Sequence, residues 1–161
     1  MPELVGRKLS SFMMKHSKIS TELFVQNDGI FYCSSHFRHM LRIERKRTGR
    51  SGKPFLLMLI DLSGLQTRHY GNSILEQIKE ALVASSRETD IRGWYEHHNI
   101  MGTIFTEMGS VDNSSIEIIF RKLYNKINDT LGRELLKKIK ISLHVFRYPE
   151  EEDRILVASS L

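Results

Sequence analysis

Hydrophobic and polar positions along the chain predict a domain in which helices and strands follow one another. A continuous apolar run, Pro54 to Asp61, has the sequence PFLLMLID, and such a run is expected for a central strand buried on both faces. Two β-rich runs, Ile91 to Tyr95 and Ile100 to Phe105, flank the polar tetrapeptide Glu96-His97-His98-Asn99, which is typical of a β-hairpin with a short turn. We expect the functional chemistry around this hairpin, between Arg87 and Glu107.

Apolar residues at three- and four-residue spacing predict helices before and after these strands. Ser34 or Ser35 is the expected N-cap of the first helix, and Gly132 is the expected end of the last. A half-buried strand is predicted from the alternation near the C-terminus, followed by a short edge strand. The expected ranges are helices from Ser34 to Arg47, from Asn72 to Ser86 and from an N-cap at Asp112, Asn113 or Ser114 to Leu131, and strands from Ile139 to Phe146 and Ile155 to Ala158.

The order of these elements is helix, strand, helix, strand, strand, helix, strand. It predicts an α/β fold, more closely an α+β sandwich, with a mainly antiparallel central sheet and helices packed against it. We expect residues 30–161 to form this domain. Residues 1–29 are interpreted as an N-terminal extension, in which Leu4, Leu9, Phe12 and Met13 can form one helical stripe.

Charge, apolar runs and cysteine content indicate which partners and which cellular location to expect. The formal charge of +5 and the pI near 9.4 permit acidic partners, including nucleotides. No apolar run approaches the roughly 20 residues that a membrane span needs, and we see no secretory signal at the N-terminus. Cys33 is the only cysteine, so an intramolecular disulfide is impossible and a cytoplasmic location is expected.

Three segments together resemble a known family. PFLLMLID, RETDIRGWYEHHNIMGTIF and ISLHVFRYP resemble the nucleotidyl cyclase (palm-like) fold of GGDEF-type diguanylate cyclase domains, over about residues 30 to 150. The signature of that family is RxxD, five residues, and then a GGDEF turn. The same spacing here places Arg87 and Asp90 on the RxxD pair, and Glu96-His97-His98-Asn99-Ile100 on the turn.

The signature turn itself is degenerate. Its two glycines, which let the backbone approach a phosphate, are replaced by Glu96 and His97, and its metal-binding acids by His98 and Asn99. Asp61 is the only matching carboxylate, a vestigial metal position, and magnesium prefers several carboxylate or phosphate oxygens. The connection that follows Asp61 is also shorter than in the family. The family's phosphate- and guanine-binding motifs lie in the part that is missing here. We therefore expect a pseudo-enzyme without cyclase activity and without a cofactor.

The RxxD pair matches the family residue by residue. The resemblance implies that Arg87 and Asp90 form the inhibitory site that holds the guanine edge of cyclic di-GMP, in a module of bacterial signalling or envelope-polysaccharide systems. A guanidinium can donate to guanine O6 and N7, and a carboxylate can accept from the guanine ring N–H and amino group. Because the motif is short, a structural interpretation stays open, in which Asp90 caps the preceding helix and Arg87 pairs with Glu88 or Glu80.

The end of the first predicted helix is strongly basic. Arg42, Arg45 and Lys46 are candidate phosphate contacts for cyclic di-GMP. The plainer interpretation is a solvated face whose cations suit the negative end of a helix dipole. Aromatic residues do not alternate with these charges, which argues against a nucleic-acid partner.

Two other functions stay open. The first is a non-catalytic scaffold that binds a protein partner or a second copy of the chain, with Trp94 and Tyr95 either as interface anchors or simply on opposite faces of their strand. The second is a residual nucleotide enzyme in which Asp61, His98 and Asn99 hold a metal softer than magnesium. We expect the neighbouring His97 and His98 side chains to diverge, so that they are poor joint ligands.

Overall fold

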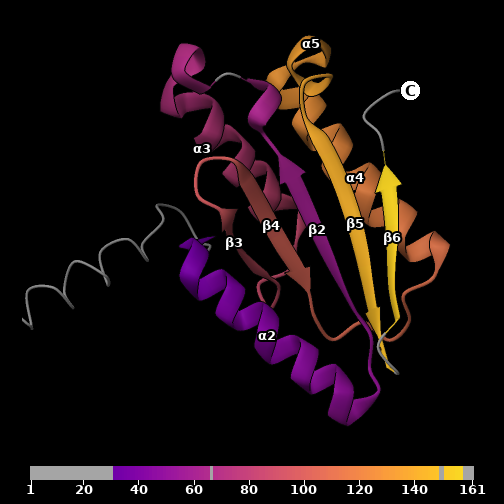
Figure 1. The fold of residues 1–161 in the computed structure, drawn as a ribbon. Helices are drawn as coiled ribbons and strands as arrows, with labels where there is room; N and C mark the ends of the chain where they lie inside the picture. The colour runs from indigo at the N-terminus through magenta and orange to yellow at the C-terminus, as the bar shows by residue number, and fades with distance from the viewer. Residues whose placement is uncertain (1–30, 66, 149–150, 158–161) are drawn as a thin grey trace, which may run out of the picture.

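Figure 1 shows how the helices and strands follow one another. The computed structural model describes residues 31–65, 67–148 and 151–157, with side chains over 31–65 and 71–148. The N-terminal extension expected over residues 1–29, and Ala158 of the last predicted strand, lie outside the described residues. The elements are β1 (Phe31–Tyr32), α2 (Ser34–Ser51), β2 (Phe55–Asp61), the 3-10 turn η1 (Ser63–Leu65), α3 (Thr67–Ser85), β3 (Ile91–Glu96), β4 (Ile100–Phe105), α4 (Asn113–Leu131), α5 (Arg133–Leu136), β5 (Lys140–Arg147) and β6 (Glu151–Val157).

The strands form one six-stranded sheet in the order β1-β3-β4-β2-β5-β6. β1 is parallel to β3, and the other neighbouring strands are antiparallel. β2 lies between β4 and β5, so that Met58 has Thr103 on one side and Leu143 on the other. The predicted α/β class with a mainly antiparallel central sheet is confirmed, and so is a central strand buried on both faces.

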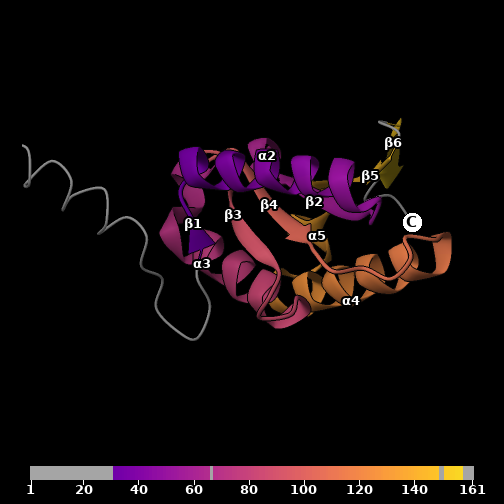
Figure 2. The same cartoon turned by 90° about the horizontal axis from the view of Figure 1, so that it is seen from below.

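Helices cover the two faces of the sheet unequally. α2 lies along one face, whereas α3 and α4 pack together on the other (Figure 2). The alternation of side chains along β2 matches this arrangement, because Leu56, Met58 and Ile60 belong to the core on the α3 and α4 side. Phe55 and Leu57 belong to a smaller core with Phe37 of α2.

Two glycines let α2 approach the sheet closely. Gly93 of β3 and Gly102 of β4 are cross-strand partners, and the fully buried Phe37 ring lies against both. A Cβ atom on Gly102 would stand 2.6 Å from Phe37 Cζ, and one on Gly93 would stand 2.6 Å from the Tyr32 carbonyl oxygen. Both distances are shorter than van der Waals contact, so the packing of α2 depends on glycine at these positions.

The first helix differs from its prediction at both ends. Cys33, rather than Ser34 or Ser35, is the N-cap, and its side chain caps no backbone group. The helix also continues past Arg47 to Ser51, and ends where Gly52 adopts a left-handed conformation (φ 71°). The Thr48 hydroxyl donates to the Lys53 carbonyl (2.9 Å), and this local side-chain bond stabilises the last turn beyond what backbone propensity predicts.

The other predicted helices and strands are present, but some of them begin or end at different residues. Asp112 is the N-cap of α4, accepting the Ser115 N–H at 2.8 Å, and Gly132 follows the helix as expected. α3 begins at Thr67 instead of Asn72, with a kink at Gly71, and β6 begins at Glu151 instead of Ile155. β1, η1 and α5 were not predicted, because two to four residues are too few to show a periodicity. No helix in the described part of the chain is long and apolar enough to cross a membrane.

Candidate functional site

The hairpin turn, Glu96 to Asn99, is closed by its own polar groups. Asn99 donates its backbone N–H to the Glu96 carbonyl (3.1 Å) and its side-chain Nδ2 to Glu96 Oε1 (2.7 Å). The Glu96 carboxylate is therefore engaged inside the turn. His98 has a positive φ of 61°, a conformation that histidine adopts more readily than most residues but that glycine adopts without strain.

Asp61 lies next to this turn, as the resemblance implies. It pairs with Ile100 across the sheet, and the next residue, Leu62, donates its N–H to the Asn99 carbonyl (2.8 Å). Asp61 Oδ1 accepts the N–H of Ser63 at 2.9 Å, so one carboxylate oxygen is used to hold its own loop. On the other side Lys140 of β5 is the cross-strand partner of Asp61, which places a cationic residue beside the candidate metal position.

The imidazoles of the turn lie together, contrary to the prediction that they diverge. The ring centroids of His97 and His98 are 3.9 Å apart, and both rings lie within 6 Å of Trp94. A shared aromatic neighbour brings them to the same side, which the alternation rule for a regular strand does not anticipate in a turn. Even so, the described residues contain no group of three or more His, Cys, Asp or Glu side chains placed to hold a metal.

The other end of β3 carries the RxxD pair. Asp90 immediately precedes the strand, and its side chain is only 1% exposed. Its Oδ2 accepts the backbone N–H of Arg87 (2.7 Å), while Oδ1 accepts the backbone N–H of Thr106 (3.2 Å), just after β4. The carboxylate therefore joins the end of α3 to the end of β4.

Arg87 is close to Asp90 but faces the solvent. Its Nη2 donates to the Thr106 carbonyl (2.6 Å) and lies 3.4 Å from Asp90 Oδ1, yet 58% of the side chain is exposed. The pair is brought together as the resemblance implies. The structural interpretation also holds in part, because Asp90 closes the turn after α3, but Arg87 pairs with Asp90 and not with Glu88 or Glu80.

A buried arginine, missed by the sequence analysis, supports this pair. Arg92 is 4% exposed, and its Nη1 donates to Ser86 Oγ (2.8 Å) and to the Arg87 carbonyl (2.9 Å). Burial lowers the pKa of its guanidinium, partly offset by the nearby Asp90. Arg92 thus provides a positive charge at the C-terminal end of α3, where the helix dipole is negative.

The only signal of this role in the sequence is a charged residue inside the apolar run IRGWY. Arg92 Nε, together with Ser85 Oγ and Thr103 Oγ1, is a buried polar atom without a hydrogen-bond partner in the described part of the chain. Arg87, Asp90, Arg92 and Thr106 are called the Asp90 junction below.

The remaining candidates stand apart from the Asp90 junction. Arg42, Arg45 and Lys46 are exposed on α2, which covers the face of the sheet opposite α3. Arg45 lies over the Phe146 ring of β5 (5.1 Å to the centroid). Within the described residues, no ion pair or hydrogen bond connects these three cations to Arg87 or Asp90, so the structure does not join them into one site.

Comparison with known proteins supports the fold. No protein-family model and no curated protein matches the chain. A DGC protein from Thermotoga maritima matches with a TM-score of 0.57 and 20% identity, over 74% of this chain and 83% of that chain. The diguanylate cyclase SiaD from Pseudomonas aeruginosa, solved in complex with its activator SiaC, matches with a TM-score of 0.54 and 13% identity. That match covers 92% of this chain but 59% of SiaD.

The chain thus has the fold of diguanylate cyclase proteins, and the predicted GGDEF-like, nucleotidyl cyclase type of architecture is confirmed. At these identities the likeness concerns the fold alone.

Proposed function

We propose that this chain is a catalytically inactive, degenerate GGDEF-like domain that acts as a regulatory module in signalling. The observation that supports this best is the set of groups around Asp61. One carboxylate, already bonded to the Ser63 N–H, stands between the turn and Lys140. Magnesium needs several hard oxygen ligands around it, and the neighbouring turn supplies imidazole, amide and a Glu96 carboxylate engaged with Asn99.

The inactivity has a direct test. The purified protein is incubated with GTP and magnesium or manganese, and cyclic di-GMP is measured by chromatography. We expect no product, because the metal ligands and the glycine turn are both replaced. Product formation that disappears in Asp61→Ala would overturn the proposal and support the residual enzyme instead.

Cyclic di-GMP is the ligand that we propose for the Asp90 junction. The exposed guanidinium of Arg87 supports this assignment, because Thr106 and Asp90 hold only its Nη2 and leave Nε and Nη1 without a partner in the described part of the chain. A guanidinium held in this way still has an N–H group free to donate a charge-assisted hydrogen bond to guanine O6 or N7. Asp90 is too buried to meet the guanine itself, so its role is to hold Arg87.

Calorimetry with cyclic di-GMP tests this ligand on wild type, Arg87→Ala and Arg121→Ala. Arg121 is a matched control, since it is also an exposed arginine in an ion pair within one helical turn, with Glu117. We expect binding to wild type and Arg121→Ala, and loss of binding in Arg87→Ala. Equal binding by all three proteins would remove Arg87 from the site.

A protein partner, or a second copy of the chain, is the alternative to a nucleotide ligand. It is favoured by the SiaD structure, in which a diguanylate cyclase is bound by its activator. Trp94 is not an anchor for such a surface, because it is buried in the core, while Tyr95 lies half-buried on the other face of the strand. A reducing cytoplasm, which the single Cys33 fits, is the proposed location in either case.

A stoichiometric complex in a pulldown, insensitive to cyclic di-GMP and to Arg87→Ala, would favour the protein partner over the nucleotide.

A further inference from the structure

The outward side of α2 carries positive charge along its whole length. Five exposed cations, which we call the basic face of α2, are Arg38, Arg42, Arg45, Lys46 and Arg50. The only acid in the helix, Glu44, is 6% exposed and is paired with Arg47. The basic face therefore contains no negative charge of its own.

Several cations of the other helices are neutralised within their own helix, whereas others, such as Lys122 and Lys126, form no ion pair among the described residues. Lys79, Arg121 and Lys137 each pair with a glutamate one helical turn away. None of the five residues of the basic face forms an ion pair with any residue that the structure describes. Their charge is consequently available to an external anion.

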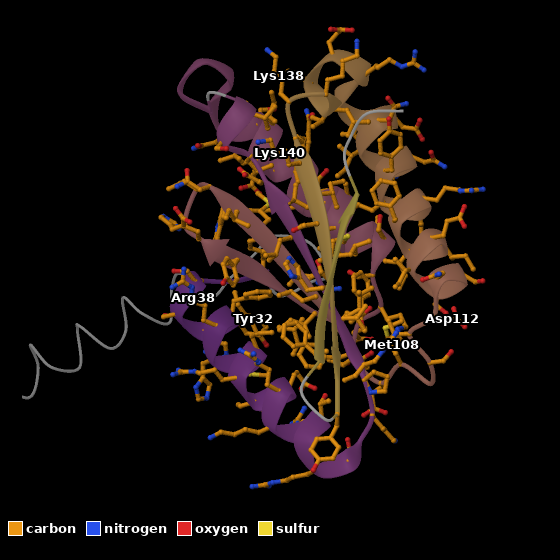
Figure 3. The ribbon with its side chains drawn as sticks, turned by 45° about the vertical axis from the view of Figure 1, so that its right-hand side comes forward. Tyr32, Arg38, Met108, Asp112, Lys138 and Lys140 are labelled. Carbon is orange, nitrogen blue, oxygen red and sulfur yellow. The ribbon has the colours of Figure 1, made fainter. Side chains whose placement is uncertain are left out.

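Two of the five side chains are held against the sheet. Arg38 donates its Nε to the Tyr95 carbonyl (2.8 Å) and lies over the Tyr95 ring, and Arg45 lies over the Phe146 ring. Figure 3 shows Arg38 at the start of the helix. Arg42, Lys46 and Arg50 are four residues apart, so they follow one another along the helix at intervals of about 6 Å.

The basic face is an outer surface and not a pocket. α2 is the outermost layer on its side of the sheet and lies lengthwise on it (Figure 2). A helix in this position can touch a flat surface with most of its length. It does not protrude as a helix must to enter the major groove of a duplex.

We propose that the basic face of α2 docks on the anionic phosphate surface of a phospholipid bilayer. The complementarity is electrostatic, because no large apolar residue of α2 is fully exposed for insertion into the bilayer. Single-stranded nucleic acid is disfavoured, because Phe37, the only aromatic ring of α2 besides its histidines, is fully buried and cannot stack on bases.

The test uses sedimentation with vesicles of phosphatidylcholine, with and without phosphatidylglycerol. The test variant combines Arg42→Gln, Lys46→Gln and Arg50→Gln, and the matched control combines Lys122→Gln, Lys126→Gln and Arg133→Gln on α4 and α5. All six residues are exposed, both variants lose three charges, and circular dichroism verifies that both are folded.

Each cation near an anionic membrane strengthens binding roughly fivefold. We therefore expect the test variant to bind phosphatidylglycerol vesicles about 100-fold more weakly than wild type, and the control variant to bind much as wild type does. Wild-type binding should also weaken as salt is raised from about 0.1 M to about 1 M, where the screening length becomes shorter.

Three results would each overturn the proposal. They are equal binding by the two variants, equal binding of wild type to vesicles with and without phosphatidylglycerol, and binding of wild type to duplex DNA but not to the anionic vesicles.

Discussion

An aspartate lies near each end of the β3–β4 hairpin, Asp90 before β3 and Asp61 at the end of β2, and the two carboxylates are used differently. Asp90, before the strand, is buried and accepts two backbone N–H groups, from Arg87 and Thr106. Asp61, beside the turn at the other end, is partly exposed and accepts one N–H, from Ser63. The first joins the turn after α3 to the end of β4, whereas the second stabilises only its own loop.

This contrast shows where the domain depends on its polar residues. A buried carboxylate with several donors stabilises the fold whether or not a ligand binds, because removing it leaves buried donors unpaired. A partly exposed carboxylate that accepts one N–H from its own loop contributes much less to stability. At the Asp61 end, imidazole and amide groups lie where the resemblance leads us to expect metal ligands, which agrees with the inactivity that we propose.

Replacement of Asp90 should have the largest effect. Asp90→Ala leaves the N–H groups of Arg87 and Thr106 without partners, and we expect the free energy of unfolding to fall by about 4 kcal/mol. Urea denaturation at neutral pH measures this change. A fall of less than about 1 kcal/mol would mean that water replaces the carboxylate. Asp90 and Asp61 would then not differ in their contribution to stability.

Replacement of Arg92 should have an intermediate effect. Arg92→Met keeps most of the buried volume but removes the bonds to Ser86 Oγ and the Arg87 carbonyl. Removal of the unpaired Nε offsets part of this cost. We therefore expect the free energy of unfolding to fall by about 2 kcal/mol. Hydrogen exchange should show faster opening at the end of α3 than in β5. Uniformly faster exchange would instead assign Arg92 to the stability of the whole sheet.

Replacement of Asp61 should have little effect. Asp61→Asn retains an oxygen that can accept the Ser63 N–H, so the free energy of unfolding should change by less than about 0.5 kcal/mol. Magnesium should not raise the Tm of wild type or variant, since a ligand stabilises only the protein that binds it. A magnesium-dependent rise in Tm that is absent in Asp61→Asn would show a working metal site.

Replacement of His98 should have an effect as small as that of Asp61. His98→Gly relieves a positive φ but makes the unfolded chain more flexible, and the two terms nearly cancel, leaving a change within about 0.5 kcal/mol. Thermal unfolding monitored by circular dichroism measures it. A large destabilisation would mean that the packing among Trp94, His97 and His98 holds the turn, and that this end is more than an exposed loop.

Much of the architecture was predictable because its signals are local. The run PFLLMLID is long and apolar enough to be read as a central strand, and the polar residues between two β-rich runs define the hairpin. The spacing from Arg87 to the turn also predicted which residues lie at either end of β3. Arg92 was not predicted, because a buried arginine in a strand differs from an exposed one only through its burial and its hydrogen-bond partners, here Ser86 and the Arg87 carbonyl.

The sequence by itself determined the order of the main elements and the place of the hairpin with its polar turn, since these follow from neighbouring side chains and their periodicity. Only the tertiary structure decided which polar groups are buried and what they bond. It showed that the Asp90 carboxylate joins α3 to β4, and that Arg87 remains exposed beside it. It also separated Arg42, Arg45 and Lys46 from that junction, because α2 and α3 pack on opposite faces of one sheet.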